Sequence, residues 1–412
     1  VPSKDANGHG TYLAGLAAGR SFPLQNFTGA APMSDLAIVK LKPAKKYLRD
    51  YYLIPEKADA FQENDIMMGI KYLRVLADRF RQPLVILLGL GSNYGSHTGS
   101  SPLSQVAQNY GGFFGIATVI AAGNETGLAH HYAGRLSADT SYEDVELRVG
   151  KKEAERGFIL ELWSSATELY TVGFVSPGGE RINRIPILAN NETRIPFLLE
   201  NTTVTVNYEL IEAGSGSQLV SMRFEKPSAG IWTIRVYNTQ FLTGDYHMWL
   251  PVQSFISDET VFLKPDPSNT ITVPGNSRLP ITVGAYDHRN NSIYIHSSRG
   301  YISRDSVKPD LAAPGVDVLG PANTSVHSGI LKNTQTFTHR TGTSAAAAIT
   351  AGAVANLLNW GIVMGNYPTM SEASIKSYLI RGASRNPSLS YPNREFGYGT
   401  LDLLQTFLKL RE

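Results

Sequence analysis

A serine at the start of an alanine-rich stretch is the first residue whose type and setting could do chemistry. Ser344 lies in RTGTSAAAAITAG, positions 340 to 352, and the residues that follow it are strong helix formers. A helix that begins here would place free N–H groups and the positive end of its dipole beside the serine oxygen, which would stabilise a developing oxyanion. Serine is also favoured as a helix N-cap, so an ordinary capping role is the alternative.

Two further motifs could supply the rest of an acyl-transfer site. His9 lies in DANGHGTYLAGLAAG, before a second helix of small residues, where its imidazole could act as a general base. Asn124 lies in VIAAGNETG and closes a buried strand, where its amide could donate to an oxyanion. Taken singly, a lone histidine is usually structural, and an asparagine after glycine is an ordinary turn residue.

Composition excludes several classes of function. The chain has 412 residues, of which 42% are hydrophobic, so it can bury a large core and form two domains or one domain with an insertion. The formal charge is +2, from 37 basic and 35 acidic residues, and no basic stripe is present, so we expect no nucleic-acid partner. The longest apolar run, PLVILLGLG, is too short to span a bilayer, so we expect no membrane partner. Because the chain has no cysteine, disulfides and a thiol nucleophile are excluded.

The periodicity of the first third predicts an α/β architecture. Buried strands are expected at 34–41, 83–91 and 116–124, with helices at 62–80 and within 101–115. Continuous apolar strands that alternate with helices predict a parallel sheet covered on both faces. The same pattern returns near the C-terminus, with strands at 278–287 and 316–321 and helices at 344–358 and 371–381. Thr369 and Glu372 have the spacing of a capping box for the last of these helices.

The middle of the chain has a different pattern. Residues 133–256 contain short alternating runs rich in Val, Thr, Tyr and Phe, separated by Gly, Pro and Asn turns, which predict an inserted antiparallel β-sandwich of jelly-roll-like type. The domain organisation expected is therefore 1–132 and 257–412 for the α/β part, with 133–256 inserted. The sandwich could bind carbohydrate or a partner through aromatic residues such as Trp163, Trp232 and Trp249, but core positions are the expected role of these side chains.

Four motifs, in their order along the chain, resemble the subtilase family of serine peptidases. They are NGHGTYLAGLAAG, AAGNETG, SSRG followed by KPDLAAPG, and GTSAAAA. The histidine precedes the serine, as in subtilisin and unlike the order in α/β-hydrolases. The inserted sandwich and the ending YPNREFGYGTLDLLQTF are similar to the clostridial subtilases, including those that act in spore germination.

The resemblance implies a subtilisin-like three-layer α/β/α fold with a mainly parallel sheet, and an endopeptidase that acts through an acyl-enzyme. It implies that Ser344 is the nucleophile and that His9 is the general base and then the general acid. Asn124 and the backbone N–H of Ser344 would donate to the oxyanion. A secreted, cell-envelope or spore-associated bacterial enzyme is the expected setting.

The family segment that pairs with the substrate backbone matches LGLGSN, positions 88 to 93. Leu90 and Gly91 would form one wall of the primary pocket, and Ala122 and Gly123 would form the other. A protein or peptide substrate would then bind as an added strand. A plain core strand is the alternative for this segment.

The triad aspartate of the family has no counterpart in this sequence. It lies on a strand some tens of residues before the histidine, whereas Asp5 is the sole acid before His9 and matches an ordinary position of the histidine motif. Asp5 is expected to cap the helix or anchor the turn. We expect the chain to be the larger piece of a self-processed enzyme, with a bound N-terminal fragment or propeptide that carries the aspartate. The alternative is an impaired pseudoprotease that acts as a binding or sensing module.

No cofactor and no catalytic metal are expected. His130 and His131 lie near Asp139 in the sequence, but adjacent side chains point apart and no spaced third ligand is evident. No loop has the alternating carboxylates that would locate a calcium ion.

Overall fold

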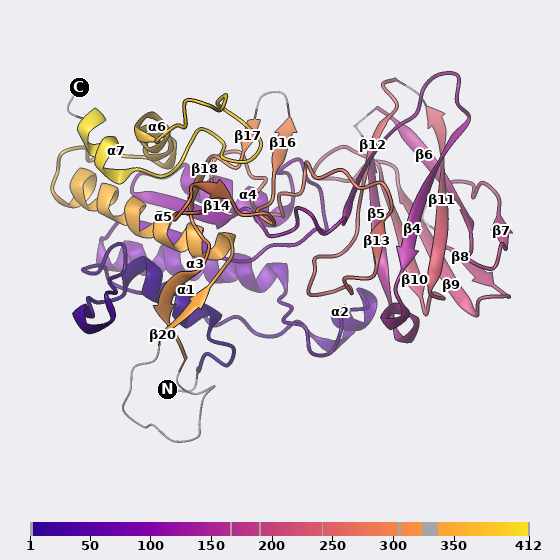
Figure 1. Ribbon diagram of the computed structural model, residues 1–412, viewed down its shortest axis with the longest axis horizontal. Helices are drawn as coiled ribbons and strands as arrows, with labels where there is room; N and C mark the ends of the chain where they lie inside the picture. Colours follow the sequence, from indigo (N-terminus) through magenta and orange to yellow (C-terminus); the bar gives the residue numbers. More distant parts are fainter. Residues whose placement is uncertain are drawn as a thin grey trace.

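The computed structural model describes residues 3–164, 167–188, 191–240, 242–303, 306–323 and 337–410. Figure 1 shows two regions side by side along the long axis. The α/β region comprises the described residues before His131 and after Phe262, and it contains the helices and the parallel sheet. In the strand region, from His131 to Phe262, the described regular elements are β-strands apart from one short 3-10 helix, Lys151–Glu155.

A parallel sheet forms the middle layer of the α/β region. Its strands follow the order β1 (Leu84–Leu88), β2 (Ile116–Ala121), β14 (Ile281–Asp287) and β18 (Leu311–Pro314), with the short β15 (Ser292–Ile293) antiparallel to β14. Alternate residues of β2 face opposite layers: Ala117 and Val119 pack with α5 (Thr343–Leu358), whereas Ile116 and Ile120 pack with α3 (Glu63–Phe80) and α4 (Pro102–Gly111). The result is a three-layer, mixed α/β arrangement, as the sequence predicts.

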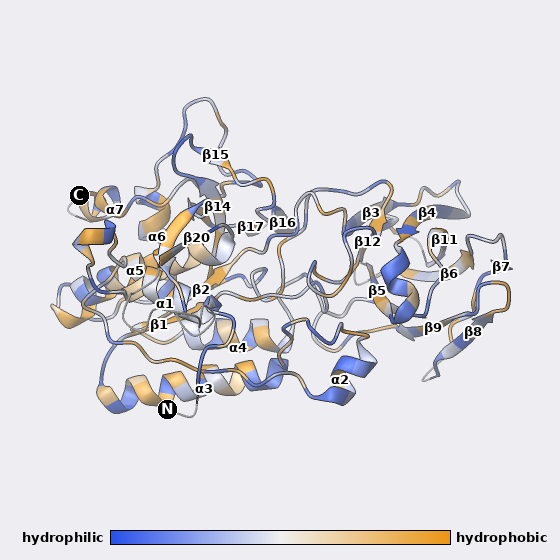
Figure 2. Cartoon of the chain, turned by 60° about the horizontal axis from the view of Figure 1, so that its bottom comes forward, coloured by the Kyte–Doolittle hydropathy of each residue, from blue (hydrophilic) through white to orange (hydrophobic). Residues whose placement is uncertain are grey.

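The other elements of the α/β region are short. They are α1 (His9–Ala18), α2 (Lys46–Tyr51), α6 (Glu372–Gly382) and α7 (Leu403–Lys409), and the two-stranded sheets β16–β17 (Gly300–Ser303, Ser306–Lys308) and β19–β20 (Val318–Pro321, Phe337–Arg340). The predicted strand at 316–321 therefore forms a hairpin outside the parallel sheet. In Figure 2, α3 alternates hydrophobic and hydrophilic residues, as expected of a helix that covers one face of a sheet.

Small residues let α5 lie close to its neighbours. A Cβ atom built on Gly352 would lie 2.5 Å from the Cβ of Ala30 and 2.6 Å from the carbonyl oxygen of Ala17, so a side chain has no room there. The stretch Thr343–Val363 is long and apolar enough to cross a membrane, but 61% of its most apolar window is buried inside the protein. Its hydropathy is that of a core helix.

The predicted strand at 34–41 is not a strand in the structure. The segment is extended and mostly exposed, and Leu36 and Ile38 are 54% and 66% exposed. It packs against α3, where Val39 lies beside Gly69, and it pairs with no described strand. Because β1 is the last strand of the described sheet on its side, the backbone of residues 35–41 has no described hydrogen-bond partner, and Ser34 bonds only within a turn, to the carbonyl oxygen of Ala31.

The predicted capping box of α6 is also wrong. Ser371 is the N-cap, and it exchanges hydrogen bonds with Ser374. Glu372 is instead fully buried, and its Oε1 accepts a hydrogen bond from the backbone N–H of Thr118 in β2. A capping box with the predicted spacing exists, but it lies two positions later, at Ser371 and Ser374, and Glu372 instead joins α6 to the sheet.

Two antiparallel sheets make up the strand region. One follows the order β3 (His131–Arg135), β12 (Asp245–Trp249), β5 (Gly157–Ser164), β10 (Leu219–Glu225), β9 (Thr202–Glu209) and β8 (Thr193–Phe197). The other follows β13 (Val261–Phe262), β4 (Tyr142–Val149), β11 (Gly230–Gln240), β6 (Leu169–Val175) and β7 (Arg181–Ile182). The first strand begins two residues before the predicted range 133–256 and the last strand lies beyond its end, because β3 and β13 are too short to give a clear alternating pattern.

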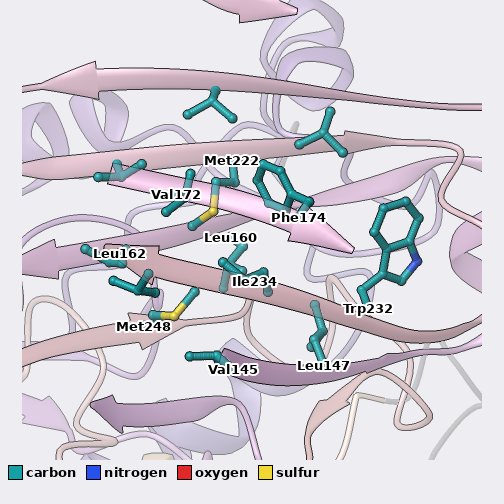
Figure 3. Close-up of a cluster of buried hydrophobic side chains, with 14 of the residues drawn as sticks. Val145, Leu147, Leu160, Leu162, Val172, Phe174, Met222, Trp232, Ile234 and Met248 are labelled. Carbon is teal, nitrogen blue, oxygen red and sulfur yellow. The ribbon is translucent and has the colours of Figure 1, made fainter. Parts of the chain in front are cut away.

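Side chains from both sheets form one core. Figure 3 shows these side chains between the strands, among them Leu160, Met222, Phe174 and Trp232. All three tryptophans singled out in the sequence are at least nine-tenths buried: Trp232 is 0% exposed, Trp249 4% and Trp163 6%. Their burial matches the core role rather than an exposed carbohydrate platform.

Candidate active site

His9 and Ser344 meet at one turn of the backbone. His9 is the first residue of α1, Ser344 is the second residue of α5, and Gly89 directly follows β1. A Cβ atom built on Gly89 would lie 3.5 Å from Cε1 of His9 and 3.5 Å from Cβ of Ser344. Both side chains therefore border the same point, although 335 positions separate them in the chain (344 minus 9).

Ser344 does not cap its helix. The N-cap of α5 is Gly342, which makes no side-chain cap, so the capping alternative is excluded. The hydroxyl of Ser344 donates to the carbonyl oxygen of Gly89 at 3.1 Å. No hydrogen bond joins it to His9 within the described residues. Such bonds in free serine peptidases are often long and tighten when substrate binds.

The imidazole of His9 is half-buried and is held by its helix. Gly8 has φ +80°, a left-handed conformation that suits glycine and lets α1 begin at His9. Burial lowers the pKa of His9 below its ordinary value, and the cation of Arg340 lowers it further, while Asp5 and Asp59 act in the opposite direction. The neutral imidazole that a general base requires is therefore favoured near pH 7.

Asp5 anchors the turn before α1, as the sequence predicts. Its Oδ1 accepts the backbone N–H of Gly8 at 2.9 Å, and its Oδ2 accepts the N–H and hydroxyl of Thr11 at 2.8 and 2.7 Å. Both carboxylate oxygens of Asp5 are therefore already hydrogen-bonded to residues at the start of α1. Among the described residues, no carboxylate bonds the imidazole of His9.

Asn124 is tied to the residue before the serine. Its Oδ1 accepts the backbone N–H of Thr343 at 3.0 Å and the Thr343 hydroxyl at 3.2 Å. This fixes the amide so that Nδ2, which has no partner among the described residues, is the end that can donate. Thr343 also bonds the N–H of Gly123 through Oγ1 at 3.1 Å, so it holds the loop after β2 to the start of α5.

The four predicted wall residues follow two neighbouring strands. Leu90 and Gly91 come after β1 and are partly to fully exposed, and neither makes a described backbone hydrogen bond to another segment. Ala122 and Gly123 come after β2, and their backbone groups are already bonded, to Val283, Thr272, Ser298 and Thr343. Only the first pair therefore offers a free backbone edge to a bound peptide.

Thr272 lies between these two pairs and was missed by sequence reasoning. A Cβ built on Gly91 would lie 2.2 Å from the Thr272 hydroxyl oxygen, and one built on Gly123 would lie 2.6 Å from its methyl carbon. Gly123 has φ +105°, which suits glycine. Thr272 is 3% exposed. No local sequence pattern marks Thr272, because its contacts with Gly91 and Gly123 form only when distant segments pack together. Thr343, by contrast, could have been found from its place directly before Ser344.

The histidines considered as metal ligands have protein partners instead. His130 Nδ1 lies 2.8 Å from Oε2 of Glu125, and His131 Nε2 lies 3.0 Å from Nδ1 of His247. Asp139 is not part of either contact. Over the described ranges, no group of three or more His, Asp or Glu side chains is arranged to hold a metal ion.

A serine and a histidine at the starts of two helices meet beside Gly89, which follows the parallel strand β1, and the carboxamide of Asn124, which follows the parallel strand β2, bonds the residue before the serine. Such an arrangement is that of the class of serine peptidases. Comparisons with known proteins agree. Residues 258–399 match the profile of the subtilase family. Serine protease AprX of Bacillus subtilis (strain 168) is 32% identical over 129 residues, which span 29% of this chain and 28% of AprX. The chain thus covers less than two thirds of that relative.

A solved structure covers the whole chain. The CspB protease of Clostridium perfringens superposes with a TM-score of 0.86 at 30% sequence identity, over 100% of this chain and 81% of that one. The chain therefore belongs to the subtilase family of serine proteases.

Proposed function

We propose that this protein is a serine endopeptidase that hydrolyses peptide bonds through an acyl-enzyme. The observation that carries the proposal is the convergence of His9 and Ser344 on Gly89, with Asn124 bonded to the residue before the serine. These side chains come from three distant segments of the chain, and a purely structural role for each would not require them to share one site.

The chemistry follows from the positions of these groups. His9 takes the proton of Ser344 as Oγ attacks the carbonyl carbon of the substrate, and Nδ2 of Asn124 and the N–H of Ser344 stabilise the oxyanion that forms. The C–N bond then breaks, and His9 gives the proton to the leaving amine. Water, with His9 again as base, hydrolyses the acyl-enzyme and restores the serine hydroxyl.

The triad carboxylate is proposed to come from an N-terminal segment bound as a strand between 34–41 and β1. Two features support this. The edge of β1 and the backbone of 34–41 both lack a described strand partner, and the apolar side chains of Leu36 and Ile38 are exposed. An aspartate at the end of such a strand would take a position that Asp5 does not fill, because Asp5 is bonded to Gly8 and Thr11.

The substrate is proposed to bind as an added strand along Leu90 and Gly91, whose backbone groups have no described partner in the protein. Thr272 fills the space between the two walls, and this supports a shallow primary pocket that favours small side chains.

A pseudoprotease is the second candidate. It is favoured by the hydrogen bond of Ser344 to Gly89 and by the lack of a carboxylate on His9 among the described residues. Such a protein would bind peptides along the same wall without cleaving them.

Peptide hydrolysis by the purified protein, with everything that copurifies, separates the two candidates. We expect cleavage of peptides with small residues before the scissile bond, and its loss in Ser344→Ala. Ser377→Ala, which removes an exposed hydroxyl on α6 outside the proposed site, should retain most of the turnover. Binding of the peptide with no cleavage by any form would contradict the peptidase and support the pseudoprotease.

Mass spectrometry tests the bound segment. Under native conditions we expect a species heavier than the 44.9 kDa of this chain, which separates under denaturing conditions into the chain and a smaller, aspartate-containing peptide. Sequencing of that peptide would identify the aspartate. An active protein whose native and denatured masses are both 44.9 kDa would contradict this part of the proposal.

A further inference from the structure

The segment that directly follows the peptide-binding wall is held by the strand region. Residues Asn93 to His97 leave the wall and cross to the junction between the two regions. The side chain of Asn93 donates through Nδ2 to the carbonyl oxygen of Leu250, directly after β12, at 3.0 Å. Only four residues, Gly89 to Ser92, therefore lie between the end of β1 and the first contact with the strand region, and they include Leu90 and Gly91 of the wall.

Glu161 of β5 makes the next contact. Its side chain is 7% exposed, and Oε2 accepts the backbone N–H of Gly95 at 3.0 Å and the indole N–H of Trp163 at 2.9 Å. Burial raises the pKa of this carboxyl to about 7, while the bonds from Gly95 and Trp163 act in the opposite direction. Burial of a carboxyl group costs free energy unless the group is hydrogen-bonded, and these two bonds supply that compensation for Glu161.

Trp249 of β12 makes the third contact. Its ring stacks on the ring of His97 with centroids 3.8 Å apart and planes within 5°. His97 in turn lies between two backbone carbonyls: Nε2 is 3.1 Å from the oxygen of Asn93 and Nδ1 is 3.2 Å from the oxygen of Ile271. Ile271 directly precedes Thr272, so this stack links the strand region to both sides of the pocket.

We infer that Glu161 and Trp249 are positioning residues for the peptide-binding wall, so that the strand region sets the affinity of the peptidase site for its substrate. The inference rests on the proposed function, because the wall matters only if peptide binds there. Neither residue has a described contact with His9, Ser344 or Asn124. Their loss should therefore weaken peptide binding and leave the reactivity of Ser344 unchanged.

The test compares Glu161→Ala with Glu168→Ala. Glu168 is a matched control, since it is a 1% exposed carboxylate of the strand region that bonds Tyr170, Thr243 and Gly244 and does not contact residues 93–97. After active sites are counted with a fluorophosphonate, we expect KM for a peptide to rise about tenfold in Glu161→Ala with kcat changed less than about twofold. Glu168→Ala should leave KM unchanged per active site. Glu161→Gln, which keeps an acceptor oxygen, should stay near the parent.

A second measurement does not depend on activity. Hydrogen exchange of the backbone at 88–97 should be faster in Glu161→Ala than in the parent, and unchanged in Glu168→Ala. If exchange at 88–97 and KM are the same in the two variants, the inference is overturned. If the parent cleaves no peptide, the proposed function fails, and the exchange data alone still decide whether Glu161 holds the wall.

Discussion

The cores of the two regions differ in the size of the side chains that fill them. The strand region uses large side chains: Trp232, Phe174 and Phe224 are at most 1% exposed. Along α5, the α/β region instead uses alanines and one glycine, Gly352, which let the helix backbone lie close to its neighbours. The site therefore rests on helices that approach one another closely, whereas the core of the strand region is filled by large side chains.

The regions also differ in how their strands are paired. In the strand region, every strand lies in one of two antiparallel sheets. In the α/β region, β1 ends the described sheet and the extended segment 34–41 pairs with no described strand. The site residue nearest to this unpaired edge is Gly89, where His9 and Ser344 meet. The region with the unpaired described edge is thus the one in which His9 and Ser344 come together.

Among the changes considered, removal of the proposed general base in the α/β region should lower kcat most. His9→Ala should lower kcat by a factor on the order of 10⁶, as expected when the base of a serine peptidase triad is lost. Steady-state kinetics would measure this, and His288→Ala, an exposed histidine of the same region, is the control. An effect smaller than about tenfold would show that His9 is not the base.

Asn124→Ala should lower kcat by about 10²–10³, because one oxyanion donor is removed, with little change in KM. Thr343→Val keeps the backbone N–H that bonds Asn124 and loses the hydroxyl that bonds Asn124 and Gly123, so its loss of kcat should be smaller. Equal losses in the two variants would indicate that Asn124 acts only by holding α5.

The comparison of the cores can be tested by changing side-chain size in opposite directions. Phe224→Ala should lower the free energy of unfolding of the strand region by about 3–5 kcal/mol through a cavity. Gly352→Val should destabilise the α/β region by about 1–3 kcal/mol or more through overpacking against Ala30. Denaturant unfolding followed by hydrogen exchange would assign each loss to its region. If Gly352→Val is neutral, close approach of α5 is not what fixes this core.

Sequence periodicity predicted the strands of the strand region better than it predicted the segment 34–41 at the edge of the α/β region. Strands such as β9 and β10 alternate buried and half-buried residues, and their partners lie nearby in the chain, so local pattern and tertiary context agree. The run at 34–41 has the composition of a buried strand, but a strand exists only where another pairs with it. Its pattern could not reveal that the described sheet provides no such neighbour.

The sequence predicts the placement of those candidate site residues that lie in short recognisable motifs. His9, Ser344 and Asn124 each lie beside glycines and small residues that mark a helix start or a strand end, and the structure brings them together. Thr272, Glu161 and Trp249 have no such mark, because their contacts with Gly91, Gly95 and His97, respectively, depend on how distant segments pack. Packing of this kind is decided by tertiary structure rather than by local spacing.

Enlarging the pocket should change selectivity modestly. Thr272→Gly removes the side chain that fills the space between Gly91 and Gly123, so kcat/KM for a peptide with a Leu before the scissile bond should rise about tenfold relative to one with Ala. Thr270→Gly, a buried threonine two positions earlier, is the control. If selectivity is unchanged, Thr272 does not form the base of the pocket.

Acid should weaken the junction between the regions slightly. Burial lowers the pKa of His97 to about 4, below its unfolded value, so its contribution to stability is complete above pH 6.5 and is lost as the pH falls toward 4. His97→Phe keeps a ring on Trp249 but cannot titrate. Its Tm should therefore fall about 2–4 °C less than that of the parent between pH 7 and 4.5. Parallel Tm curves would mean that His97 does not contribute.

Labelling of the whole assembly with a fluorophosphonate, followed by peptide mapping, tests most directly whether His9, Ser344 and Asn124 form one working site. We predict one label for each chain, on Ser344, and none on Ser344→Ala. An assembly that contains the aspartate-bearing segment and leaves Ser344 unlabelled would contradict the account.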